Sequence, residues 1–326
     1  MRTSTISTNN LLFVHGKGFK PPADELFDLS KAALRAGLQR DYPEQIDQYD
    51  KLSVNMAYYG DLTNTFLREL GRDFDHKTDI GDRKNALKQL RKIDARKKFS
   101  IRNYDCRPGK TAVPEFLANV IVPIFGVLGL TKKLVARISP DFAEYLAEDS
   151  DYGQGVRNRV REKLCELLDR DERIMVISHG TGCVLVYDVL WQLSHDERYI
   201  EKYGDKKIDC WVTLGAPLGD NYIRKYLKGA TGEAASYPQN VISWHNVAAE
   251  DDYICHDNTL ADDFKSMLQQ QVVSEVQDYR VYNLAVRYGK SNPHSSVGYY
   301  IHPRVSKIVV DWLRTPAVES DPVYTI

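Results

Sequence analysis

A glycine occupies the position where one segment of this chain would otherwise carry a reactive side chain. Residues 174–177 form an apolar run, residues 178–183 read Ser-His-Gly-Thr-Gly-Cys, and residues 184–191 form an apolar helical stretch. In a strand, sharp turn and helix of this kind, the nucleophile stands at the tip of the turn. The tip here is Gly180, which has no side chain. The tip of this turn therefore lacks the side-chain atom that could attack a substrate.

A second glycine-rich turn follows the first apolar run of the chain. Residues 11–14 are apolar, and His15-Gly16-Lys17-Gly18 comes directly after them. Small residues in such a turn let backbone N–H groups face a developing negative oxygen, as in an oxyanion hole. A glycine turn after a strand is common, so the pattern is weak alone. Its position before a helix and its pairing with the turn at residues 178–183 favour the functional interpretation.

These segments resemble the lipase/esterase branch of the α/β-hydrolase superfamily. Residues 212–219, Val-Thr-Leu-Gly-Ala-Pro-Leu-Gly, resemble a further segment of lipase-like hydrolases, for which we expect a structural role. The resemblance implies a carboxylic-ester substrate, which includes lipid acyl esters, and no organic cofactor. It also implies that the N–H groups of Lys17 and Thr181 form the oxyanion hole.

The same resemblance assigns the remaining catalytic roles. The order of turn, acid and histidine along the chain is that of the family. It implies His294 as the general base, with His302 as a nearby alternative. The acid is expected in the loop that contains Glu250, Asp251 and Asp252. Asp252 fits the family pattern best and Asp251 is second, whereas the plainer interpretation of this loop is a solvated acidic turn.

Three neighbours of Gly180 carry an atom that could replace the missing nucleophile. Ser178 lies at the strand end, where a small residue is expected for packing, and Thr181 must direct its N–H toward the oxyanion. Cys183 is more typical of a small buried residue than of a thiolate. Glycine at the tip therefore predicts either a serine enzyme that has lost its nucleophile, by engineering or in nature, or a non-catalytic ligand- or partner-binding protein on a hydrolase fold.

Apolar runs alternate with helical patterns along the chain, which predicts an α/β fold with a mostly parallel sheet and helices on both faces. The expected strands are residues 11–14, 52–57, 174–177, 208–214, 241–245 and 280–284. We expect one domain over residues 1–326. Residues 62–150 interrupt the strand rhythm and are interpreted as a helical insertion, the place where hydrolases of this type carry a lid.

Composition excludes several classes of function. The net charge is -1 among 326 residues, and no nucleic-acid-binding module is recognisable. The five cysteines are widely spaced without a CxxC pair, so neither a disulfide framework nor a metal site is indicated. No signal-peptide core and no apolar run of membrane-spanning length is present. These features favour a cytoplasmic protein.

One segment departs from this neutral balance. Eleven lysines and arginines face three aspartates between residues 82 and 110, and an apolar run follows at 116–128. A basic stretch beside an apolar one suits peripheral contact with an anionic membrane surface through residues 82–130. The plainer interpretation is a solvated basic helix beside buried helices.

Overall fold

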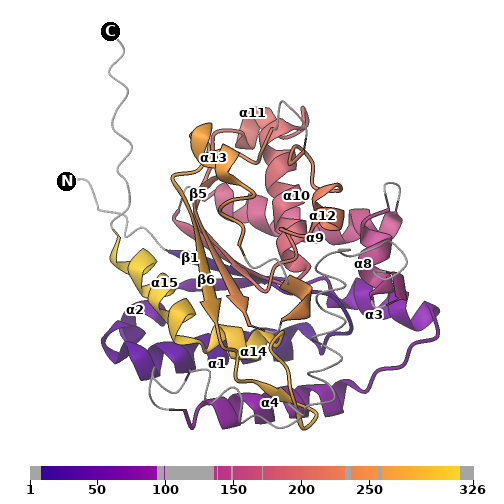
Figure 1. The fold of residues 1–326 in the computed structure, drawn as a ribbon, viewed down its shortest axis with the longest axis vertical. Coiled ribbons are helices and arrows are strands. Elements are labelled where there is room, and N and C mark those ends of the chain that lie inside the picture. Colours follow the sequence, from indigo (N-terminus) through magenta and orange to yellow (C-terminus); the bar gives the residue numbers. More distant parts are fainter. Residues whose placement is uncertain are drawn as a thin grey trace.

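The computed structural model describes residues 9–93, 99, 136–137, 139–147, 150–170, 172–231, 236–250, 252–255 and 259–315. Six parallel strands form one sheet in the order β2-β1-β3-β4-β5-β6, with helices around it (Figure 1). The strands are β1 (Asn10–Val14), β2 (Ser53–Ala57), β3 (Ile174–His179), β4 (Ile208–Leu214), β5 (Val241–Ala249) and β6 (Glu275–Val281). A separate antiparallel pair comprises β7 (Val286–Arg287) and β8 (Lys290–Ser291).

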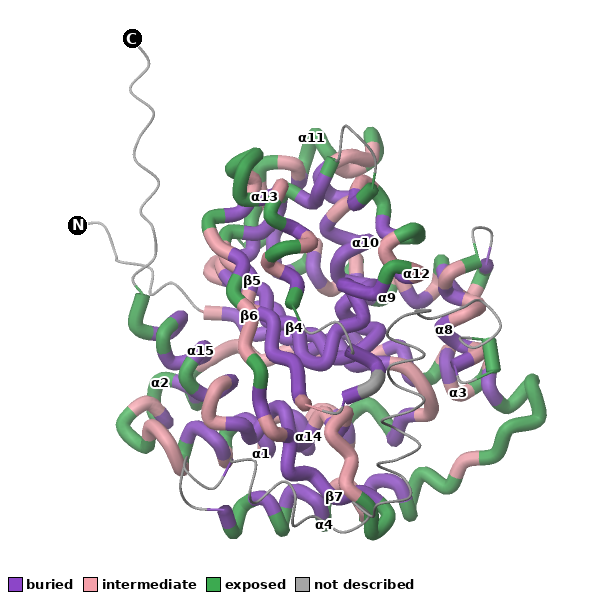
Figure 2. Tube along the Cα trace, in the orientation of Figure 1, coloured by how far each residue is buried: buried purple, intermediate pink, exposed green. Residues whose placement is uncertain are grey.

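Helices cover both faces of the sheet because successive side chains of its strands point to opposite faces and both sets are apolar. On β1, Leu12 and Val14 join the core beneath α9 and α10, whereas Leu11 and Phe13 join the core beneath α1, α4, α14 and α15. Strands β1 and β3 are buried along their whole length, and β4 and β5 are mostly buried (Figure 2). The larger helices are α1 (Ala23–Asp41), α3 (Gly60–Glu69), α4 (His76–Leu90), α9 (Asp151–Leu168), α10 (Gly182–His195) and α15 (Pro303–Arg314).

The remaining helical segments are short. They are η1 (Pro43–Gln45), α2 (Ile46–Tyr49), α8 (Pro140–Tyr145), α11 (Ile200–Tyr203), α12 (Asn221–Arg224), η3 (Tyr253–Cys255), α13 (Lys265–Gln269) and α14 (Ser296–Tyr300). A polar side chain caps α12, where the carboxylate of Asp220 accepts hydrogen bonds from two N–H groups of the first turn.

The strand order reverses beside β1. The chain runs from β1 to β2 on one side of it and then crosses back to β3 on its other side. In open parallel sheets, ligands bind outside the carboxyl ends of the strands at such a switch point. Val14 of β1 pairs with Ser178 of β3, so the two glycine-rich turns leave the sheet side by side.

The predicted mostly parallel α/β fold is confirmed, with the largest differences in strand bounds at β3, β5 and β6. The strand expected at 174–177 continues as β3 to His179. The strand expected at 241–245 continues as β5 to Ala249. The strand expected at 280–284 is wrong in its bounds, because β6 spans Glu275–Val281. As an edge strand, β6 presents exposed or half-buried polar side chains such as Gln277. The strand therefore contains no apolar run that would predict it.

Within residues 62–150 the structure describes most of α3, all of α4 and α8, and non-helical segments at 70–75 and 91–93, while the helical insertion as a whole stays a prediction. Most of the basic and apolar segment proposed for the lid lies outside the described residues. Within the described part of the chain, no helix combines the length and apolar character needed to cross a membrane.

Candidate functional site

Three loops from the carboxyl ends of the strands meet at Gly180. The N–H of Gly180 donates to the carbonyl of Leu214 at the end of β4 (2.8 Å), and the N–H of Gly215 donates to Val247 in β5 (3.0 Å). Gly182 packs so closely that a Cβ there would lie 2.3 Å from the carbonyl oxygen of His15. This contact joins the first turn of α10 to the loop after β1.

The backbone at Gly180 is left-handed, with a φ of 56°. A Cβ at this position would lie 3.0 Å from Nε2 of His294, so a side chain here would face the imidazole. Glycine adopts this conformation without the steric cost that it carries for other residues. The structure therefore brings the predicted nucleophile position and the predicted base together.

His294, which is partly exposed, forms a hydrogen-bonded pair with the buried Asp252. Nδ1 of His294 lies 2.9 Å from Oδ2 and 3.1 Å from Oδ1 of Asp252, whose side chain is fully enclosed. Tyr299 Oη donates to Oδ2 (2.8 Å), and the N–H of Ile254 donates to Oδ1 (3.1 Å). Burial acts to raise the pKa of Asp252, but His294 and these hydrogen bonds outweigh it and hold the pKa below its ordinary value. Asp252 is thus a stable anion beside the imidazole.

A second histidine, His179, holds the backbone of His294 in place by a hydrogen bond. Nε2 of His179 donates to the carbonyl oxygen of His294 (2.9 Å), and the two ring centroids are 4.6 Å apart. Burial, followed by the charges of His294 and Lys20, lowers the pKa of His179 well below its ordinary value. A neutral His179 carries the proton that this hydrogen bond requires. In the sequence, His179 is marked only by its position directly before Gly180.

The loop after β1 is held in a fixed orientation. The N–H of Gly18 donates to Oδ2 of Asp141 (2.7 Å), and the ammonium of Lys20 donates to the carbonyl oxygens of Lys17, Gly18 (2.9 Å) and Phe19 (3.3 Å). Among the described residues, neither the N–H of Lys17 nor the N–H of Thr181 has an acceptor. Both amides are therefore available to a ligand.

Ser178, Cys183 and His302, three of the alternatives considered for this site, are engaged in other hydrogen bonds. Ser178 is fully buried, where its hydroxyl donates to Cys183 Sγ (3.2 Å) and accepts from Trp211 (2.9 Å). Burial raises the pKa of the Cys183 thiol to about 12, which disfavours a thiolate. His302 caps α15 by accepting the N–H of Arg304 (3.0 Å). Asp251 lies outside the described residues.

The absence of a side chain at Gly215 leaves room for the pair of His294 and Asp252, and a substitution of Gly215 tests this role. Its φ is 56°, and a Cβ would lie 2.8 Å from Oδ2 of Asp252. We expect Gly215→Ala to lower the free energy of unfolding by about 2–3 kcal/mol in urea titration, since backbone strain of about 1–2 kcal/mol adds to the crowding. Gly289→Ala is the matched control, because Gly289 also has a positive φ (73°) but no atom within 4 Å of its Cβ position. Equal losses in the two variants would contradict this role.

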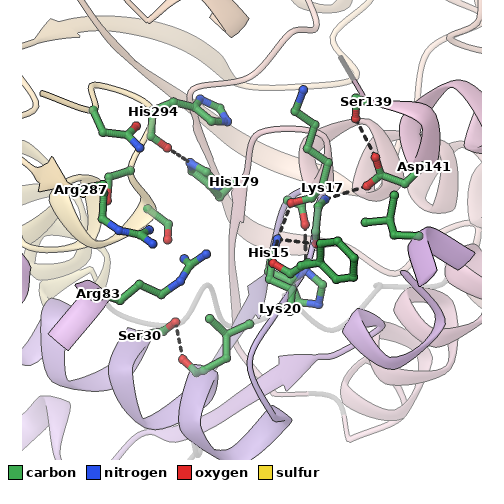
Figure 3. Close-up of a pocket in the computed structure, with 18 of the residues that line it drawn as sticks. His15, Lys17, Lys20, Ser30, Arg83, Ser139, Asp141, His179, Arg287 and His294 are labelled. Atoms are coloured by element: carbon green, nitrogen blue, oxygen red, sulfur yellow. Dashed lines mark hydrogen bonds between the residues drawn. The ribbon is translucent and has the colours of Figure 1, made fainter. Parts of the chain in front are cut away.

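A cavity of about 290 Å³ opens beside this cluster (Figure 3). His179 and His294 lie on one side of it, and Lys17 and Lys20 from the loop after β1 lie on another. Its described lining contains five cationic side chains but a single carboxylate, that of Asp141. The cations are Lys17, Lys20, Arg72, Arg83 and Arg287.

Comparisons with known protein families, with curated proteins and with solved structures find no match to this chain. Among the described residues, no group of three or more histidine, cysteine or carboxylate side chains is arranged to hold a metal ion.

Proposed function

We propose that this site is that of a carboxylic-ester hydrolase of the α/β-hydrolase type, of the lipase/esterase kind, with the nucleophile side chain absent at Gly180. One observation carries the proposal: the pair of His294 and the buried Asp252 directs Nε2 of the imidazole at the tip of the turn, 3.0 Å from the Cβ position of residue 180. In acyl hydrolases the base and its orienting carboxylate stand in this arrangement relative to the position of the nucleophile.

Each group has a role in this reaction. Asp252 holds the proton of the imidazole on Nδ1, which leaves Nε2 free to accept a proton from a hydroxyl at residue 180 or from water. The N–H groups of Lys17 and Thr181 donate to the oxygen that becomes negative when the ester carbonyl is attacked. The leaving alcohol then takes the proton from Nε2 of His294.

A second function, ligand binding without turnover, is favoured by the chemistry around Gly180 itself. Gly180 offers no nucleophilic atom, and the hydroxyl of Ser178 and the thiol of Cys183 are buried and hydrogen-bonded to each other. In serine hydrolases, the oxyanion hole and substrate binding alone still give about 10³–10⁴-fold acceleration over water. Slow turnover by this chain is therefore compatible with both functions.

The variant Gly180→Ser separates the two. If the site is that of a hydrolase, we expect Gly180→Ser to raise kcat/KM for p-nitrophenyl butyrate at least about hundredfold over the unaltered chain. The gain is limited by the strain of a non-glycine residue at this φ, on the order of 1–3 kcal/mol, and by the small shift that the His294 ring must make.

Gly180→Ala is the matched control, because it adds the Cβ and the strain without the hydroxyl. Inhibition of Gly180→Ser by an alkyl fluorophosphonate would locate the new activity at the hydroxyl. A folded Gly180→Ser protein as slow as Gly180→Ala would reject the hydrolase function and favour the binding protein.

Contact with an anionic lipid surface through residues 82–130 is part of the same proposal. In its described portion, Lys84, Lys88 and Arg91 of the α4 region are exposed, whereas Arg83 lines the cavity. Binding to vesicles should rise with the fraction of anionic lipid and fall with salt. Equal binding to neutral vesicles would speak against this contact.

A further inference from the structure

Two arginines from distant parts of the chain lie at the wall of the cavity beside His294. Arg83 comes from α4 and Arg287 from β7, and their guanidinium groups share one carboxylate. Nε of Arg83 lies 2.6 Å from Oδ2 of Asp79, and Nη2 of Arg287 lies 2.7 Å from Oδ1. Arg287 also pairs with Asp82. Only 13% of the Arg83 side chain and 7% of the Arg287 side chain are exposed.

The ion pairs leave several guanidinium donors unused. Among the described residues, both Nη groups of Arg83 and Nη1 of Arg287 have no acceptor. Figure 3 shows the two guanidinium groups facing the interior of the cavity. Asp79 and Asp82 do not line the cavity. Their carboxylates therefore bind the two arginines on the side away from the cavity, and the remaining charged N–H groups face into it.

The loop after β1 places the amino groups of Lys17 and Lys20 at another wall of the cavity. Lys20 is 7% exposed, and its ammonium contacts backbone carbonyl oxygens, not a carboxylate. Burial, followed by the charge of Arg83, lowers the pKa of Lys20 to about 7. The ammonium of Lys17 has no partner among the described residues and also lines the cavity. An anion in the cavity would satisfy both walls at once.

A purely structural role accounts for only part of this arrangement. Asp79 and Asp82 tie α4 to the β7–β8 pair, and a single guanidinium would suffice for that link. The structure instead places two nearly buried guanidinium groups on one carboxylate with their remaining donors turned into the cavity. Planar guanidinium donors match the oxygens of carboxylate and phosphate groups, and such charge-assisted hydrogen bonds are stronger than neutral ones.

We propose that this cavity binds a carboxylate or phosphate group of the ester substrate, with Arg83 and Arg287 as its main donors. The inference rests on the proposed hydrolase function and adds the substrate class, namely a small anionic ester. The volume of about 290 Å³ accommodates a compact charged group and not a long acyl chain. Because His294 lines the same cavity, the anion lies on the part of the substrate next to the scissile bond.

The first test uses the unaltered chain and does not need turnover. Calorimetric titration with inorganic phosphate at low ionic strength should show binding at one site. Arg83→Gln removes two cavity donors and leaves Asp79 paired with Arg287, so we expect it to weaken phosphate binding by about tenfold to hundredfold. Lys88→Gln is the matched control, since it removes the same charge from an exposed position of α4.

The second test uses Gly180→Ser and two esters of similar size, p-nitrophenyl hemisuccinate and the neutral p-nitrophenyl butyrate. We expect kcat/KM to favour the anionic ester at least about tenfold, and Arg83→Gln to remove the preference mainly through KM. Phosphate binding without ester preference would mean that the site takes a free anion, which overturns the assignment to the substrate.

The two proposals fail in different ways. If Gly180→Ser hydrolyses neither ester but phosphate binding still depends on Arg83, the hydrolase function is rejected and the anion site stands. Absent phosphate binding, or binding that Arg83→Gln leaves unchanged, overturns the anion site whatever the esters show. A folded Arg83→Gln protein, judged by its urea unfolding curve, is required for each comparison.

Discussion

Asp252→Asn, introduced together with Gly180→Ser, is expected to lower kcat by about 10²–10⁴-fold, down to the rate of the unaltered chain. The same change of the orienting aspartate in a serine protease lowers kcat by about 10⁴-fold while the geometry stays intact. The measurement is the steady-state hydrolysis of p-nitrophenyl butyrate by the single and double variants.

The contacts of Asp252 explain why one amide group has this effect. The N–H of Ile254 donates to Oδ1, so the oxygen of an asparagine amide occupies that position and the NH₂ group takes the place of Oδ2. Oδ2 is the atom that lies 2.9 Å from Nδ1 of His294. An NH₂ group there requires an unprotonated Nδ1, which moves the imidazole proton to Nε2. Such an imidazole cannot act as a base toward residue 180.

Two further variants define the cause of this loss. Asp311→Asn makes the same chemical change at an exposed position of α15 and should leave kcat unchanged. Tyr299→Phe removes one hydrogen bond to Asp252 but keeps the carboxylate, so its effect should be smaller, about tenfold. If Asp252→Asn retains the full rate of Gly180→Ser, the carboxylate does not orient His294 and the assignment of the base fails.

The positions that the sequence predicts well are those that a local pattern marks. Gly180 stands at the end of an apolar strand and the start of an apolar helix, and His294 stands two residues before α14. Because parallel strands end at one edge of the sheet, loops that follow them in the sequence meet in space. This geometry brought Gly180, Asp252 and His294 together although up to 114 residues separate them.

The supporting residues were not predictable in the same way. Tyr299 lies only five residues after His294 in the sequence. Only the folded chain shows that the hydroxyl of Tyr299 reaches Asp252. Asp79 and Arg287 are 208 residues apart, and neither belongs to a motif. An ion pair between distant residues leaves no spacing in the sequence. The basic composition around residue 83 signalled positive charge but not that Arg83 turns inward.

The edge strand β6 could not be predicted from the sequence for a different reason. Apolar runs predict strands that are buried on both faces. β6 is paired on one side only, and Asp278 within it accepts hydrogen bonds from Asn246 and from two backbone N–H groups. A strand whose polar side chains are used in this way has no apolar run to find.

Asp79→Asn is expected to lower the free energy of unfolding by about 3–5 kcal/mol, since removing one partner of a buried ion pair leaves the other charge uncompensated. Asp79 is 4% exposed and accepts hydrogen bonds from Arg83, Arg287 and Tyr288. Asparagine keeps the size of the side chain but cannot balance two guanidinium charges. Urea unfolding of the unaltered chain and the variant at neutral pH measures the difference.

An exposed ion pair provides the comparison. Asp50 pairs with Arg35 at 2.7 Å, but the two side chains are 44% and 45% exposed. Water screens this pair, so Asp50→Asn should change stability little despite its short distance. Similar losses for Asp50→Asn and Asp79→Asn would mean that burial does not set the strength of the pair at Asp79.

The dependence of stability on pH gives an independent check of the same carboxylate. Burial acts to raise the pKa of Asp79, but Arg83 and Arg287 together outweigh it and lower the pKa below 3.8. A carboxyl group whose pKa is lower in the folded chain contributes stability above its unfolded pKa, and the contribution is lost as the pH falls through the folded pKa. The difference in stability between the unaltered chain and Asp79→Asn should therefore be constant at neutral pH and shrink below about pH 4. A difference that persists unchanged at pH 2 would show that the variant acts through packing and not through the charge that holds the two arginines.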